Sequence, residues 1–235
     1  HPYRYYMIDN MEEVDYTTLF PSIEEVVVSD LEITKDNSKD VVAEIIHYLK
    51  RYIYLPTEED YLLIAIIVVH SYCVDLFDRT PYLWIQGEKG SGKTLLTQIL
   101  KGLVFNPFLV SETSAAALFR IIDTERPTLF LDEVEELQKR NASNQQIFQI
   151  MNSGYQKDGC VTRVAKAEVL RFMTYGLKII AGINPLMSTL EDRCILQNMV
   201  KPPIEVKLEV FNTMDKSFAK VIVENIHSSL RKLRS

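Results

Sequence analysis

The stretch that decides the fold is WIQGEKGSGKTLLTQIL, residues 84–100. An apolar run comes before its glycines, and apolar residues at helical spacing follow them. Three of the eight glycines of the chain fall between positions 87 and 92, and residues 87–94 have the spacing G-x-x-x-x-G-K-T. A strand, a glycine loop and a helix in this order are typical of a loop that wraps a phosphate with its backbone N–H groups, because side chains would obstruct so tight a wrap.

Each residue type in this loop has an expected role. Gly90 and Gly92 keep the wrap open, Lys93 reaches the β- and γ-phosphates of a nucleotide, and Thr94 offers its hydroxyl to Mg²⁺. The alternative is a glycine-rich turn with a chance lysine, which the strand and helix on either side disfavour. The expected nucleotide-binding set is Gly87, Glu88, Lys89, Gly90, Ser91, Gly92, Lys93 and Thr94.

A second motif, TLFLDE at residues 128–133, places two acids directly after an apolar strand. Ligands of open α/β sheets bind at the carboxyl ends of the strands. We therefore expect Asp132 to hold Mg²⁺ through water and Glu133 to polarise an attacking water as general base. The alternative is that both acids begin a solvated helix, since Glu135 and Glu136 follow.

Residues 80–200 alternate short apolar runs with helical stretches, which is typical of an α/β protein with a parallel sheet. We expect strands at residues 82–86, 108–110, 128–131, 177–183 and 195–199, and helices near residues 93–104, 113–122 and 145–154. The fold class is therefore an α/β sheet of five parallel strands flanked by helices. A further helical pattern covers residues 215–233.

The adjacency of Asp132 and Glu133 resembles the AAA+ branch of P-loop ATPases, in which the catalytic Glu directly follows the metal-side Asp. The resemblance covers about residues 81–200, half of the chain. It implies ATP as substrate and Mg²⁺ as cofactor. It also assigns Asn184, which ends the apolar run LKIIAGIN, the role of the polar residue that orients the attacking water. The alternative for Asn184 is an ordinary Asn-Pro turn.

Helicase-type AAA+ proteins, such as the MCM proteins, carry an arginine after this polar residue that serves the nucleotide of the neighbouring subunit. Arg193 matches that placement, and the resemblance therefore implies a homo-oligomeric ring, most simply a hexamer, whose sites are completed in trans. The alternative is a local ion pair of Arg193 with Glu191 or Asp192.

Residues 156–176 read as an insertion with two short strands, 160–164 and 169–174. MCM and superfamily 3 helicases carry a β-hairpin at this point, with a basic tip that lines a central channel. The resemblance implies single-stranded DNA as partner, and Arg163 and Lys166 as its contacts. Five basic residues lie between positions 157 and 178: Lys157, Arg163, Lys166, Arg171 and Lys178. The alternative is an ordinary two-stranded excursion with solvated charges.

SAAALFRIIDTERPTLFLDEVEEL and NSGYQKDG look similar to ATPase domains in primase-helicase proteins of phages and mobile genetic elements, including staphylococcal ones. The function we expect is the ATP-hydrolysing motor of a replicative DNA helicase. A loader or switch ATPase that remodels a partner, and a non-catalytic nucleotide-binding module, are the alternatives. Two features depart from the family: a lid with its sensing arginine is not evident, since Arg231 and Arg234 fit poorly, and a separate DNA-binding domain is not visible.

The charge of the chain is unevenly distributed. The 235 residues carry a net charge of −6, which by itself argues against a nucleic-acid partner. Residues 1–60 hold 5 basic and 14 acidic side chains, a balance of −9, whereas residues 61–235 hold 21 basic and 18 acidic side chains, a balance of +3. The acidic total therefore describes the N-terminal quarter and does not exclude DNA binding by the rest.

Four regions follow from these patterns: an acidic N-terminal segment (1–37), a helical hairpin (38–79), the AAA+ core (80–200) and a C-terminal helical segment (201–235). Residues 35–38 suggest a loop, and Thr57 is the expected N-cap of the second helix of the hairpin. The apolar stretch at residues 61–77 is too short for a membrane span. Three unpaired cysteines and the absence of a secretory signal at the start indicate a cytoplasmic protein.

Overall fold

The computed structural model describes residues 35–110, 115–132, 142–165, 168–211 and 218–231. The chain divides into two units, His1–Asp40 and Val41–Ser235. Of the first unit, only residues 35–40 are described, and they form the start of helix α3 (Lys35–Tyr52). Apart from the start of α3, the described residues belong to the second unit.

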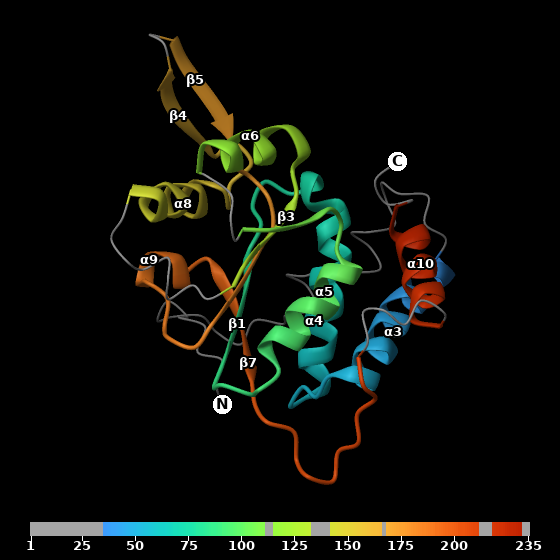
Figure 1. The fold of residues 1–235 in the computed structure, drawn as a ribbon. Helices are drawn as coiled ribbons and strands as arrows, with labels where there is room; N and C mark the ends of the chain where they lie inside the picture. The colour runs from blue at the N-terminus through green and yellow to red at the C-terminus, as the bar shows by residue number, and fades with distance from the viewer. Residues whose placement is uncertain (1–34, 111–114, 133–141, 166–167, 212–217, 232–235) are drawn as a thin grey trace, which may run out of the picture. The chain divides into compact units, whose positions relative to one another are not determined.

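A sheet of five parallel strands forms the centre of this unit (Figure 1). Its strands lie in the order β2-β3-β6-β1-β7, so that β6 lies between β1 and β3. Each strand predicted from the sequence is present, and its ends lie within one residue of the prediction. The bounds are β1 Tyr82–Gly87, β2 Pro107–Leu109, β3 Thr128–Leu131, β6 Lys178–Gly182 and β7 Cys194–Met199.

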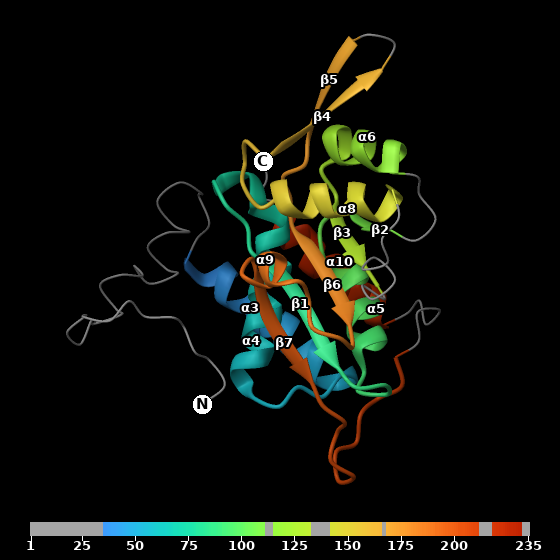
Figure 2. The same cartoon turned by 90° about the vertical axis from the view of Figure 1, so that its left-hand side faces the viewer.

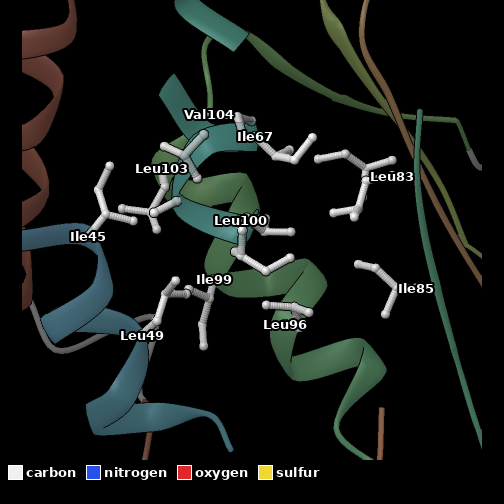
Figure 3. Packing of buried hydrophobic residues seen from close by; sticks show 14 of the residues in the cluster. Ile45, Leu49, Ile67, Leu83, Ile85, Leu96, Ile99, Leu100, Leu103 and Val104 are labelled. Atoms are coloured by element: carbon white, nitrogen blue, oxygen red, sulfur yellow. The ribbon is translucent and has the colours of Figure 1, made fainter. Parts of the chain in front are cut away.

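Alternating side chains of the sheet build two separate cores. In β1, Leu83 and Ile85 face one core, whereas Tyr82 and Trp84 face the other, as the two-residue period of a strand requires. The first core is covered by α3, α4 (Glu58–Cys73), α5 (Lys93–Leu103) and α10 (Phe218–Arg231) (Figure 3). The second is covered by α6 (Ala115–Glu125), α8 (Ala142–Ser153) and α9 (Ser188–Glu191).

The N-terminal helices share the first core with the sheet. Ile45 and Leu49 of α3 and Ile67 of α4 belong to the same buried cluster as Leu96 and Leu100 of α5 (Figure 3). Such burial contributes about 2 kcal/mol for each large aliphatic side chain, which is enough to hold both helices against α5. The hairpin predicted at residues 38–79 is therefore part of the main core.

The start of α3 differs from the sequence prediction. Residues 35–38 were expected to form a loop, but the helix already begins at Lys35. Asp, Asn and Ser are tolerated in a first turn, where the helix N–H groups have no intrahelical partners. At α4 the prediction is confirmed: Thr57 is the N-cap, and Thr57 and Asp60 bond to each other's backbone N–H.

Strands β4 (Cys160–Ala165) and β5 (Glu168–Met173) form an antiparallel hairpin outside the central sheet. The hairpin projects beyond the end at which the parallel strands begin (Figure 2). Its base is joined to that end by hydrogen bonds from Thr80 N to Tyr155 O and from Lys157 N to Asp78 O. The two strands inferred from the sequence are thus present, and the hairpin is attached at the amino end of the sheet.

Within the described residues, none of the helices is both long and apolar enough to span a bilayer. The most apolar of them, α4, buries Ile64, Ile67 and Val68 in the first core instead. The sequence interpretation of α4 as a core helix is confirmed.

Candidate functional site

The glycine loop joins the carboxyl end of β1 to the start of α5. Gly90 and Gly92 have φ values of 81° and 94°, and Gly92 is the N-cap residue of α5. This left-handed conformation is accessible to glycine at little cost but strains other residues. The two glycines therefore turn the chain sharply enough for the first backbone N–H groups of α5 to face the loop.

Gly87 and Ser91 of the glycine loop are packed closely against each other. A methyl group at Gly87 would lie 2.5 Å from the Met199 carbonyl oxygen and 2.6 Å from Ser91 Oγ. Ser91 is 3% exposed, and its hydroxyl has no hydrogen-bond partner within the described part of the chain. An orphaned buried hydroxyl costs about 1–3 kcal/mol, so this loop carries unused capacity for a polar ligand.

Lys93, the first residue of α5, folds back over the loop. Its Nζ donates hydrogen bonds to the carbonyl oxygens of Gly87 (2.7 Å) and Glu88 (2.8 Å). The side chain is half-buried, and it forms no ion pair with a described acid. Its ammonium group can therefore exchange these two carbonyl oxygens for the oxygens of a bound anion. The adjacent Thr94 is exposed.

Two more of the predicted residues lie at this edge of the sheet. Asp132 directly follows β3, and Asn184 lies two residues beyond β6; both are exposed and both have interactions with neighbouring groups. Because β6 pairs with β1 on one side and β3 on the other, their carboxyl ends are neighbours. Gln86 of β1 bridges to β6 through a 3.4 Å hydrogen bond to Ile183 O. Glu133 lies outside the described residues.

The side chains at this edge of the sheet fit a nucleoside triphosphate with a hard divalent cation. Ser91 and the start of α5 offer hydrogen-bond donors for phosphate oxygens, and Lys93 offers charge. Thr94 and Asp132 carry the hydroxyl and carboxylate oxygens that Mg²⁺ binds. Among the described residues there is no group of three His, Cys, Asp or Glu side chains that could hold a metal ion by itself.

Arg193 lies at the opposite end of the sheet. It directly precedes β7, whose first residue, Cys194, pairs with Tyr82, whereas its last, Met199, pairs with Gly87. Six residues of extended chain, roughly 20 Å, therefore separate Arg193 from the glycine loop of its own chain.

The guanidinium of Arg193 is held by neutral groups. Its Nη1 donates to Asn152 Oδ1 at 2.8 Å and to the Thr189 carbonyl oxygen, and it lies 4.7 Å from the centre of the Tyr155 ring. Within the described residues it forms no salt bridge, so the alternative pairing with Glu191 or Asp192 does not occur.

Of the basic residues around the hairpin, Lys157 and Arg171 are exposed, whereas Arg163 and Lys178 are less exposed than the sequence suggested. Arg163 donates to Gln149 Oε1 at 2.8 Å, and its guanidinium lies 4.6 Å from the centre of the Phe119 ring. It therefore packs against helices α6 and α8, two residues short of the end of β4. Lys166 falls outside the described residues.

Lys178 differs most from the sequence interpretation, in which it was one of the solvated basic residues near the hairpin. Its side chain is 1% exposed, and Nζ donates to the carbonyl oxygens of Gly154, Thr174 and Gly176 at 3.3, 3.1 and 2.9 Å. Burial lowers the pKa of Lys178 from 10.5 to about 7. Lys178 ties the end of α8 and the exit of the hairpin to the amino end of the sheet, and it is unavailable to a ligand.

The three cysteines are free thiols, as the sequence indicated. Burial raises the pKa of Cys73 to about 11 and that of Cys194 to about 12, so neither is a reactive thiolate near neutral pH. His70 donates or accepts a 2.7 Å hydrogen bond with Thr80 Oγ1, and burial lowers its pKa to about 4. It is therefore a neutral histidine with a structural hydrogen bond.

One cation near the glycine loop was not singled out from the sequence. Lys201 follows β7 and is exposed, and its Cε would lie 3.9 Å from a methyl group at Gly90. A lysine before two prolines belongs to no motif from which a binding role could be predicted. The pairing of β7 with β1 brings it to the loop.

No protein-family model matches the chain, and no curated protein matches it. Solved structures that resemble it include the A-form apo structure of the NrS-1 C-terminal region, with 14% sequence identity and a TM-score of 0.45. The match covers 85% of this chain and 45% of that one, so the chain spans less than half the length of that structure. At this level of similarity the match carries no functional argument, and a function has to be inferred from the site itself.

Proposed function

We propose that the chain is an Mg²⁺-dependent P-loop ATPase of the AAA+ type and the motor domain of a ring-forming replicative DNA helicase of a phage or mobile genetic element. One observation carries the ATPase part of the proposal. The glycine loop with Lys93, the residue Asp132 and the residue Asn184 follow the carboxyl ends of three neighbouring strands, β1, β3 and β6. A phosphate-binding loop, a metal-side acid and a polar residue are thus gathered at one edge.

Each of these residues has a role in hydrolysis. Lys93 leaves the carbonyl oxygens of Gly87 and Glu88 and binds the β- and γ-phosphates, while Gly90 and Gly92 open the backbone N–H groups to them. Thr94 and Asp132 hold Mg²⁺, which supplies positive charge to the phosphate oxygens when bound. Glu133 accepts the proton of the attacking water, and Asn184 orients that water.

Arg193 is proposed to act in trans. Its position at the amino end of the sheet supports this, because it cannot reach the loop of its own chain. In a ring, most simply a hexamer, it would stabilise the negative charge that develops on the nucleotide of the adjacent subunit.

The DNA-binding part of the proposal rests on the hairpin β4–β5. It projects from the end of the sheet opposite the nucleotide loop (Figure 2), so a ring could direct its tips to a shared channel. We propose Lys166, which lies between the two strands in the sequence, as a DNA contact. Arg163 remains a candidate contact, and its bond to Gln149 would have to be exchanged for one to a phosphate.

The test is an assay of ATP hydrolysis with and without Mg²⁺ and single-stranded DNA, together with the unwinding of a forked duplex. We expect hydrolysis that needs Mg²⁺, rises several-fold with single-stranded DNA and opens the duplex. Hydrolysis that ignores DNA and opens no duplex would support the alternative of a loader or switch. A chain that binds no ATP would overturn the ATPase proposal itself.

A further inference from the structure

The segment after β7 passes beside the glycine loop because of the strand register. Gly87, the last residue of β1, pairs with Met199, the last residue of β7. The chain therefore leaves β7 at the same edge at which the loop begins. Met199 closes against the loop, since its Cε would lie 3.6 Å from a methyl group at Gly92.

The backbone around Lys201 is held on both sides. Pro202 and Pro203 follow it, and a residue before proline is confined to extended conformations, so Lys201 continues the direction of β7. Farther along, Arg51 binds Glu209 through two hydrogen bonds of 3.1 and 2.7 Å, and Glu209 N donates to Arg51 O at 2.8 Å. The segment is thus anchored to α3 eight residues beyond Lys201.

The side chain of Lys201 lies beside Gly90, one of the three glycines of the loop. The Cε of Lys201 would be 3.9 Å from a methyl group at Gly90, which is the nearest approach to that position. The residue is exposed, and the salt bridges formed within the described residues do not include it. Its ammonium is thus a charge next to the loop with no ion-pair partner among the described residues.

The loop gathers positive charge from two directions. Lys89 and Lys93 come from the loop and α5, and Lys201 comes from the segment after β7; the acids described near them are Glu88 in the loop and Asp132 after β3. Like charges placed together raise each other's electrostatic energy unless an anion lies between them. A bound polyphosphate supplies that anion, and Lys201 would contact it from a segment outside the loop.

We infer that Lys201 is a nucleotide-binding residue that contacts the diphosphate part of a nucleotide held in the glycine loop of its own chain. The inference rests on the proposed nucleotide site and adds to it a binding residue from outside the loop. Because both ADP and ATP contain the diphosphate, Lys201 contributes to the affinity of both. Its contribution is electrostatic and decreases as the salt concentration rises.

The experiment measures the dissociation constants of ADP and ATP for the wild-type chain and for Lys201→Met, Lys201→Arg, Lys207→Met and Lys93→Ala. We expect Lys201→Met to raise both constants about tenfold, which corresponds to about 1.4 kcal/mol, with a weaker dependence on salt. Lys201→Arg should retain most of the affinity. Lys207→Met is the matched control, because Lys207 is an exposed lysine of the same segment away from the loop, and it should bind as the wild type does.

Three results would contradict these expectations. If Lys93→Ala loses binding while Lys201→Met stays within twofold of the wild type, the nucleotide site stands and the role of Lys201 is overturned. If the wild-type chain binds neither nucleotide, the proposed function fails before Lys201 is tested. An equal loss of affinity in Lys207→Met would also overturn the inference, since the effect would then be one of overall charge.

Discussion

Lys93 and Lys178 make the same kind of contact at opposite ends of the sheet. Each donates hydrogen bonds to backbone carbonyl oxygens, Lys93 to those of Gly87 and Glu88 and Lys178 to those of Gly154, Thr174 and Gly176. The difference is burial. Lys93 is half-buried beside an open loop, whereas Lys178 is fully enclosed and has its pKa lowered to about 7. The same contact is exchangeable in the first case and structural in the second.

This contrast extends to the residues around each lysine. At the carboxyl end, Thr94 and Lys201 are exposed and Ser91 has an unused hydroxyl. At the amino end, the guanidinium of Arg193 is held by Asn152 and stacks on Tyr155. One end of the sheet is arranged to receive a ligand, and the other is arranged to hold the hairpin. Substitutions of Lys93 and Lys178 should therefore change different properties of the protein, whereas Arg193 is expected to act on the site of a neighbouring subunit.

The largest effect is expected from Arg193→Ala, which should lower the rate of ATP hydrolysis about 1000-fold if the residue acts as an arginine finger. Steady-state hydrolysis measures it. Mixing Arg193→Ala chains with Lys93→Ala chains should restore part of the activity, because some interfaces then pair an intact Lys93 with an intact Arg193. Mixtures that stay inactive at every ratio would count against a site shared between subunits.

Lys93→Met should lower hydrolysis about 100-fold or more, because the charge on the transferring phosphate loses its cation. Its effect on stability should be small, since the two carbonyl oxygens that it leaves can bind water at the open loop. Thermal unfolding without nucleotide should match that of the wild type. A large drop in the unfolding temperature would show that Lys93 is structural and would remove the contrast with Lys178.

Lys178→Ala should have the opposite profile. It leaves three carbonyl oxygens with a buried donor missing, and we expect a loss of about 3 kcal/mol in the free energy of unfolding, measured by urea denaturation. Lys157→Ala is the matched control: Lys157 is exposed and donates to a single carbonyl oxygen, that of Asp75. It should change stability by less than about 0.5 kcal/mol. Equal losses in both variants would contradict the special role of Lys178.

The smallest effect is a pH dependence. The pKa of Lys178 is lowered to about 7 in the folded chain and is 10.5 in the unfolded chain. Between these values the unfolded chain binds more protons, so stability should rise with pH, by about 1 kcal/mol per unit near pH 8. Urea denaturation at pH 7.5 and 9 measures the rise. Lys178→Met, compared over the same interval, should lack it; a rise of equal size in that variant would assign the dependence to another group.

Much of the fold could be predicted from local patterns. The five strands and the helix after the glycine loop were expected within one residue of their observed ends, because a two-residue or 3.6-residue apolar period is a local property. The start of α3 was missed, since polar residues such as Asp36 and Ser38 suit a loop as well as a first helical turn. At that point local sequence has two solutions, and the observed one continues the amphipathic helix that buries Ile45.

Only the part of the candidate site that belongs to a contiguous motif could be predicted from the sequence. Gly90, Gly92 and Lys93 form a contiguous motif, whose chemistry can be recognised without knowledge of the rest of the chain. Lys178 and Lys201 belong to no motif. Their environments depend on segments that are distant in the sequence: the end of α8 and the hairpin for Lys178, and the pairing of β7 with β1 for Lys201.

The sequence by itself determined the strand, glycine loop and helix of residues 82–103, and the acid that follows β3, because these depend on short-range spacing and on residue types. The tertiary structure decided which cations are available. It enclosed Lys178, bound Arg163 and Arg193 to helix α8 and brought Lys201 beside Gly90. The physical reason is that the charge, burial and hydrogen bonds of a side chain depend on its neighbours in space, and strand pairing and helix packing alone determine those neighbours.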